Sequence, residues 1–160
     1  MTLWGLITLA GCGGHLVQER AIPMSTGQAD LTWATTAPEG QASLWLHYEL
    51  HADTRRAGAS GSEPVYHIEG SLTVTSGGAV VYDGPLELTE HKPPTTALTS
   101  RTVVGSHSFC GSDGCSTGGR LQILPLTGLT AGAPLQITVH LPATGGDFRV
   151  ESASVQIRAK

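Results

Sequence analysis

The sequence predicts an all-β fold, in which about eight strands form two antiparallel sheets packed face to face. Apolar and polar residues alternate in several segments, which is the period of a strand with one buried face. Turns rich in glycine and proline separate these segments, and no segment has the three-to-four-residue apolar spacing of an amphipathic helix. An immunoglobulin-like or jelly-roll sandwich fits this pattern.

The clearest strand is expected over residues 42–52. Its even-numbered positions are apolar and its odd-numbered positions are mostly polar, so that one face is buried and the other is wet. A preceding strand is expected over residues 29–36, where Leu31 and Trp33 share a face, and it ends before Pro38.

A third strand is expected over residues 65–76, with Tyr66, Ile68, Leu72 and Val74 facing inward. Gly77 and Gly78 then form a tight hairpin into a strand that continues through residue 88. The prolines at 93 and 94 stop this pairing because each lacks a backbone donor.

The second half of the chain predicts four further strands, over residues 97–109, 120–126, 135–141 and 148–160. We expect residues 120–126 to pair with residues 135–141, where leucine, isoleucine and valine alternate with polar residues. These elements place a single sandwich domain over residues 28–160.

The composition excludes some partners. The chain has 160 residues, a formal net charge of −4, 14% charged residues and 39% hydrophobic residues. It therefore lacks the basic footprint of a nucleic-acid-binding protein, and it carries enough apolar residues to form a core.

The N-terminus carries an uncharged apolar run from Leu3 to Ala10 that ends in small residues and a cysteine. Its last four residues, Leu9-Ala10-Gly11-Cys12, resemble the lipobox of bacterial lipoproteins. The resemblance implies that residues 1–11 are a signal peptide and that Cys12 becomes the first residue, carrying fatty acyl chains such as palmitate. The run is about half the ~20 residues that a membrane-spanning helix needs.

The resemblance also carries expectations about location. No lysine or arginine precedes the apolar run, so we expect the signal peptide to be incomplete at its N-terminus. Gly13 follows the cysteine, which in enterobacterial lipoproteins implies the outer membrane of the cell envelope. Residues 12–27 show no clear period, and we expect them to form a flexible tether behind the lipidated cysteine.

The remaining two cysteines form an even pair. Cys110 and Cys115 are separated by four residues, of which two are glycines, so the backbone can turn tightly enough to join them. A structural disulfide is expected, because this spacing is not that of a CxxC redox motif and no second cysteine pair is present for zinc.

No cofactor is expected in the main interpretation, but one group of side chains is a candidate metal site. His47, Glu49 and His51 share the polar face of one expected strand, and His67 and Glu69 share that of the next. If these strands are neighbours, the five residues form one patch that offers imidazole and carboxylate ligands to copper or zinc. The same patch can instead be a solvated sheet face, or an interaction surface that responds to pH.

Signatures of enzymes are absent from the sequence, and we expect no catalytic activity. Ser106, His107 and Asp113 lie close together in sequence, but that does not define a catalytic triad. Trp33 and Trp45 are candidates for stacking on sugars, or for ordinary packing.

These observations lead to one main functional hypothesis and two alternatives. The main hypothesis is a lipoprotein anchored through Cys12, whose non-catalytic sandwich binds a protein partner in the envelope or has a structural role. The first alternative is a copper- or zinc-binding module, and the second is a hydrolase of envelope polymers.

Overall fold

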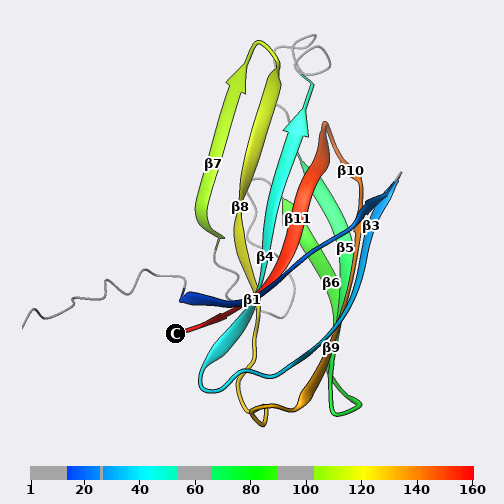
Figure 1. The fold of residues 1–160 in the computed structure, drawn as a ribbon. Helices are drawn as coiled ribbons and strands as arrows, with labels where there is room; N and C mark the ends of the chain where they lie inside the picture. Colours follow the sequence, from blue (N-terminus) through cyan, green and yellow to red (C-terminus); the bar gives the residue numbers. More distant parts are fainter. Residues whose placement is uncertain (1–13, 26, 54–65, 90–102) are drawn as a thin grey trace, which may run out of the picture.

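The computed structural model describes residues 14–25, 27–53, 66–89 and 103–160, and it confirms an all-β sandwich of two antiparallel sheets (Figure 1). The strands are β1 (His15–Ala21), β2 (Met24–Ser25), β3 (Gln28–Thr36), β4 (Ala42–Ala52), β5 (His67–Ser76), β6 (Ala79–Thr89), β7 (Val103–Gly111), β8 (Gly114–Pro125), β9 (Pro134–Pro142), β10 (Thr144–Gly145) and β11 (Phe148–Ala159). The lipobox-like segment and Cys12 lie outside the described residues.

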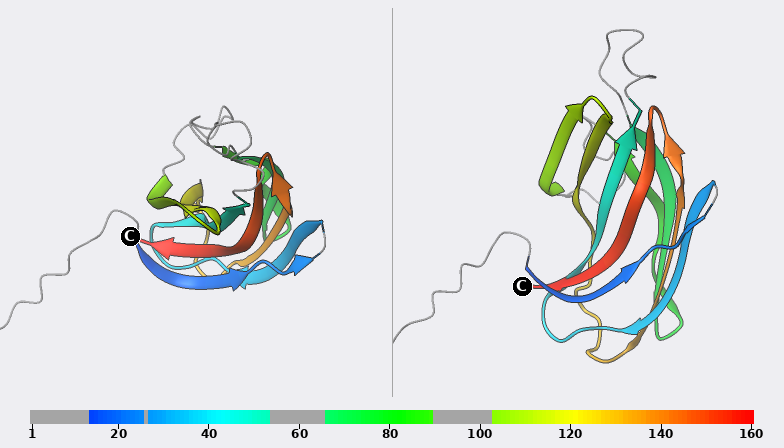
Figure 2. Two further views of the ribbon diagram at one scale, coloured as in Figure 1. Left: turned by 90° about the horizontal axis from the view of Figure 1, so that it is seen from above. Right: turned by 45° about the horizontal axis from the view of Figure 1, so that its top comes forward.

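Each sheet draws its strands from both halves of the chain. Sheet A has the order β1-β11-β4-β8-β7, with the short β10 pairing β11, and sheet B has the order β2-β3-β9-β5-β6. Figure 2 shows the two sheets facing each other when the molecule is viewed from above.

The strand neighbours differ from those that a shared metal patch requires, and from the pairing expected for residues 120–126. β4 pairs with β11 and β8 rather than with β5, and β8 pairs with β4 and β7 rather than with β9. In both places the next strand along the chain belongs to the opposite sheet. The hairpin between β5 and β6 is confirmed, with Gly77 and Gly78 both at positive φ.

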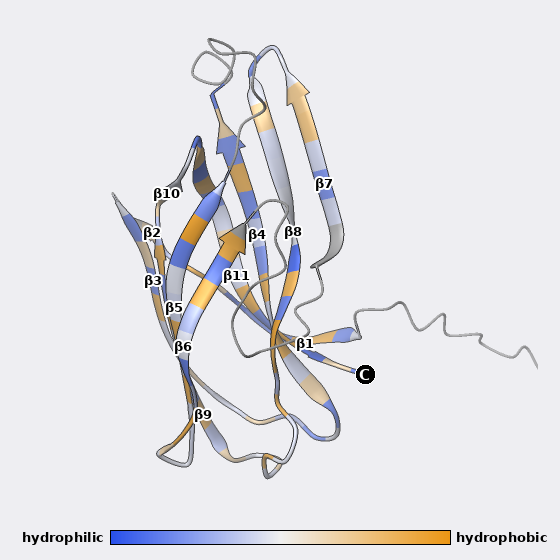
Figure 3. Ribbon diagram, turned by 180° about the vertical axis from the view of Figure 1, so that it is seen from behind, coloured by the Kyte–Doolittle hydropathy of each residue, from blue (hydrophilic) through white to orange (hydrophobic). Residues whose placement is uncertain are grey.

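The core lies between the sheets and follows the predicted alternation. All the even-numbered residues of β4, from Ala42 to Ala52, are buried. They face the buried leucine, isoleucine and valine residues of β9 and β5 in sheet B: Ile68, Leu72, Val74, Leu135, Ile137, Val139 and Leu141. Figure 3 shows the same alternation as bands of hydrophobic and hydrophilic colour along the strands.

The expected flexible tether is wrong for residues 15–21, which form strand β1 along β11. The side chain of Gln18 reaches across to sheet B, where its Nε2 donates to Thr36 O at 3.5 Å and its Oε1 accepts from Thr35 Oγ1. This strand could not be recognised in the sequence, because its residues are nearly all exposed and apolar and polar residues do not alternate along it. The sandwich therefore begins at His15 rather than near Gln28.

The strand register defines two opposite ends of sheet A. His15 pairs with Ala159, which pairs with Ala42, so the start of β1 and the C-terminus lie at one end. The turn between β7 and β8 lies at the other end, because Cys115 pairs with Ala52 at the far end of β4. In Figure 1 the start of β1 lies beside the C-terminus, and the β7–β8 hairpin projects away from both.

Candidate functional site

The five residues of the expected metal patch are divided between the two sheets. His47, Glu49 and His51 lie on the outer face of sheet A, where the alternation of β4 places them. His67 and Glu69 lie on β5 in sheet B, where His67 Nε2 is 2.6 Å from Glu69 Oε1. The expectation of one shared patch is therefore wrong, because it required β4 and β5 to be neighbours.

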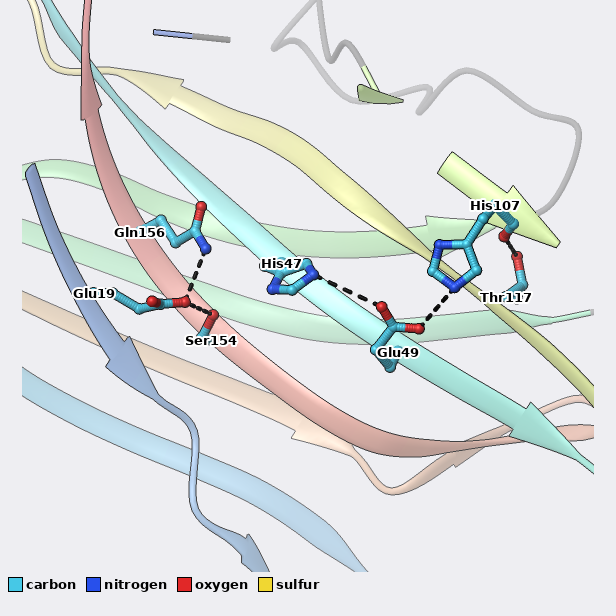
Figure 4. Close-up of polar contacts among 7 residues, drawn as sticks. All are labelled: Glu19, His47, Glu49, His107, Thr117, Ser154 and Gln156. Atoms are coloured by element: carbon cyan, nitrogen blue, oxygen red, sulfur yellow. Dashed lines mark hydrogen bonds and ion pairs between the residues drawn. The ribbon is translucent and has the colours of Figure 1, made fainter. Parts of the chain in front are cut away.

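The outer face of sheet A has its own cluster, which centres on the carboxylate of Glu49 (Figure 4). Glu49 Oε2 lies 3.0 Å from His107 Nε2, and Glu49 Oε1 lies 3.8 Å from His47 Nε2. All three side chains are partly open to solvent, with 30% of the Glu49 side chain exposed. The carboxylate thus links β4 to β7 across the intervening strand β8.

Gly118 makes this link possible. It is the β8 residue that pairs with Glu49 on one side and with His107 on the other. A Cβ atom at Gly118 would lie 2.4 Å from Glu49 Oε2 and 2.6 Å from the backbone oxygen of Tyr48. The glycine therefore provides the space in which the glutamate crosses β8.

The possible triad of Ser106, His107 and Asp113 does not form. His107 is turned to Glu49, and Asp113 lies in the hairpin turn, where its Oδ1 accepts a 3.1 Å hydrogen bond from Ser112 Oγ. Sequence reasoning missed the pairing of His107 with Glu49, because it depends on which strands are neighbours. Only the occurrence of Gly118 within a strand could have suggested that a side chain crosses there.

A second polar cluster fixes β1 onto the same face. Glu19 Oε1 accepts hydrogen bonds from Ser154 Oγ at 2.6 Å and from Gln156 Nε2 at 2.8 Å. These two hydrogen bonds are the main reason that the pKa of Glu19 lies below its ordinary value, and the charges of His47 and Arg158 act in the same direction. The donors Ser154 and Gln156 are buried, so Glu19 supplies them with an acceptor.

The two tryptophans do not offer open stacking surfaces. Trp45 lies on the outer face of β4, between Gln156 of β11 and Gln122 of β8, but only 5% of it is exposed. Trp33 packs against the core and is partly buried. Their observed positions are those of packing residues rather than of a sugar-binding platform.

The predicted disulfide is confirmed, and it joins two strands rather than closing a loop. Cys110 of β7 and Cys115 of β8 are paired residues with an S–S distance of 2.04 Å and a Cα–Cα distance of 4.0 Å. Beside it, Phe109 is 71% exposed at the end of sheet A farthest from His15. Gly114 packs against the end of β4, since a Cβ there would lie 2.5 Å from Ala52 O. At this end of the sheet, the hairpin is therefore held by the disulfide and by the contact of Gly114 with β4, and it carries an exposed aromatic ring.

Among the described residues, no group of three or more histidine, cysteine, aspartate or glutamate side chains is arranged to hold a metal ion. The same part of the chain contains no helix that is long and apolar enough to span a membrane. Comparison with known protein families, curated proteins and solved structures gives no match to this chain.

Proposed function

We propose that the chain is a lipid-anchored, non-catalytic protein of the bacterial cell envelope. In this proposal, Cys12 carries the acyl chains, and the sandwich presents the β7–β8 hairpin to an envelope protein partner. The outer membrane is the proposed location.

The observation that carries the proposal is the position of the hairpin relative to the start of β1. β1 begins only three residues after Cys12, and the hairpin lies at the opposite end of sheet A. The nine residue steps from Cys115 to Leu124 along β8 correspond to about 30 Å of strand. A membrane surface at Cys12 would therefore leave the hairpin free to meet a partner.

The form of the hairpin supports binding. Exposed aromatic side chains are enriched among residues that contribute most to protein–protein interfaces. Phe109 is the most exposed of the large hydrophobic residues among the described parts of the chain, and the adjacent disulfide limits the freedom of its strand. A preordered contact loses less conformational entropy when it binds.

The role is proposed as non-catalytic because the one catalytic grouping suggested by the sequence does not come together. His107 engages Glu49, and Asp113 is bonded by Ser112 in the turn. The polar clusters on sheet A instead connect neighbouring strands, as the Glu49 carboxylate does between β4 and β7.

The anchoring part of the proposal is tested by labelling cells with an alkynyl palmitate analogue. We expect the wild-type chain to be labelled and to sediment with membranes, and the Cys12→Ser variant to lose both properties. Unlabelled wild-type protein, or a labelled Cys12→Ser variant, would overturn this part.

The contact is tested with a photo-crosslinking amino acid placed at residue 109, compared with the same amino acid at residue 80. Val80 is a matched control because it is 66% exposed and also lies beside a hairpin turn, but in sheet B. We expect a discrete adduct with a protein from residue 109 and none from residue 80. Equal crosslinking from both positions would contradict a specific contact at Phe109.

A further inference from the structure

The strands at the ends of the sheets differ in how they are protected against pairing with another chain. β6 carries Asp83, Pro85 and Glu87, and β1 carries Glu19 and Arg20. β2 has only two residues. Charged residues, prolines and short length all discourage the addition of a further strand to an exposed edge.

β7, at the other end of sheet A, lacks such charged residues and prolines. Its sequence, VVGSHSFCG, contains no aspartate, glutamate, lysine, arginine or proline. Residues 106–111 are all exposed, and in the described part of the chain β7 pairs with β8 alone. A shift in register between Val104 and His107 confines the regular edge to residues 107–111.

The disulfide shows which way the backbone of this edge points. In antiparallel sheets, paired residues that exchange no hydrogen bonds have Cα atoms about 4.5 Å apart, whereas hydrogen-bonded pairs are about 5.5 Å apart. Cys110 and Cys115, at 4.0 Å, match the first kind. The N–H and C=O groups of Cys110, and by alternation those of Ser108, therefore point away from β8 and toward the edge.

We infer that β7 binds an extended segment of a partner protein, which adds to sheet A as a further strand beside residues 107–111 and packs an apolar side chain against Phe109. This inference rests on the proposed function, since it specifies the partner of the same hairpin. The outward backbone groups of Ser108 and Cys110 supply the hydrogen bonds, and Phe109 supplies apolar contact on one face.

A second copy of the chain fits this edge less well than a segment of another protein. Antiparallel pairing of β7 with β7 would run the two copies of sheet A in opposite directions. The two copies of His15 would then lie at opposite ends of the pair, because His15 and the hairpin are at opposite ends of each sheet. Two copies anchored in one bilayer through Cys12 could not adopt that arrangement while standing on the membrane.

The test uses the full-length chain in detergent micelles and a phage-displayed library of random nonapeptides as the probe. We expect selection of peptides in which aromatic or β-branched residues alternate with polar ones. N-methylation of the alternate peptide amides that face β7 should weaken binding by about tenfold or more, because it removes backbone donors. N-methylation of the other set of amides should change binding much less.

Two substitutions at one position provide the matched comparison. Ser108→Pro removes the N–H that points to the edge, and Ser108→Ala retains it. We expect the proline variant to lose peptide binding and the alanine variant to keep it. The methylated peptides give an independent readout if the proline variant does not fold.

Failure of this inference can be told apart from failure of the proposed function. Selection of no peptide, or of peptides indifferent to N-methylation, overturns strand addition. If peptides that are indifferent to N-methylation lose binding to a Phe109→Ala variant, the hairpin remains the contact. If crosslinking from residue 109 also gives no specific adduct, the proposed contact is overturned as well.

Discussion

Gly118 is the residue on which the link between β4 and β7 depends. We expect Gly118→Ala to lower the free energy of unfolding by about 1–3 kcal/mol, because the new Cβ would meet both Glu49 and the backbone of Tyr48. Urea denaturation of the purified protein measures this difference.

The control for this prediction is Gly111→Ala. A Cβ at Gly111 would lie 3.1 Å from the ring of Phe109, which is exposed and can rotate away. The Gly111 variant should therefore be less destabilised than the Gly118 variant. Equal stability of the Gly118 variant and the wild type would contradict the close approach of Glu49 over β8.

Glu19 should make the free energy of unfolding depend on pH in the acidic range. Its pKa is lowered in the folded state, chiefly by the hydrogen bonds from Ser154 and Gln156, so its contribution is fully present above the unfolded pKa of about 4.3. That contribution is lost as the pH falls through the lower, folded value. We therefore expect the wild type to lose more stability between pH 7 and pH 3 than Glu19→Gln does.

Urea midpoints measured at several pH values test this expectation. Ser154→Ala serves as a second variant, because it keeps the carboxylate and removes one of the two donors. It should show an acid dependence between those of the wild type and Glu19→Gln. Parallel curves for all three proteins would show that Glu19 does not have this role.

Some residue-level features could be read from the sequence, and others could not. The disulfide followed from cysteine number and spacing, and the polar positions of His47 and Glu49 followed from alternation along β4. The contact between Glu49 and His107 could not be predicted, since it joins residues 58 positions apart through the order of three strands. Spacing within one strand carries no information about that order.

At the scale of elements, β1 is where sequence and structure differ most. Native-state hydrogen exchange should find slowly exchanging amides between His15 and Ala21, because this strand pairs with β11. Gln18→Ala should speed that exchange, since it removes the contacts to Thr35 and Thr36 of sheet B. Arg20→Ala, an exposed position on the same strand, is the matched control.

Exchange of all these amides at the rate of an unstructured chain would contradict strand β1 and support a flexible tether.

Strand β1 could not be predicted from the sequence for a physical reason. β1 is an edge strand whose side chains are nearly all exposed, so it buries little apolar surface. Its sequence therefore lacks the alternation of apolar and polar residues that marks β4, β5 and β9.

At the scale of the whole molecule, the fold class followed from the sequence, but the topology did not. Alternating strands and the lack of helical periodicity correctly predicted two packed antiparallel sheets. The expected pairing of residues 120–126 with residues 135–141 is wrong, and β4 does not pair with β5, because at both connections the chain passes to the opposite sheet. Because β4 and β5 lie in different sheets, His67 and Glu69 are separated from His47 and Glu49.

The proposed arrangement of the whole molecule has an anchor at Cys12 that holds the β7–β8 hairpin away from the membrane. The most direct test is a measurement of height by energy transfer. The acylated chain is placed in a bilayer whose surface contains an acceptor dye, and a donor fluorophore is introduced as an unnatural amino acid at Ser112 or at Gln41. Ser112 lies in the hairpin turn, and the backbone oxygen of Gln41 accepts a hydrogen bond from the last residue, Lys160, at the opposite end.

We expect Ser112 to lie farther from the bilayer than Gln41, by a distance of the order of the ~30 Å from Cys115 to Leu124 along β8. Equal heights for the two positions, or a hairpin closer to the bilayer than Gln41, would contradict the proposed display. A chain that carries no acyl group and does not associate with the bilayer would contradict the anchor itself.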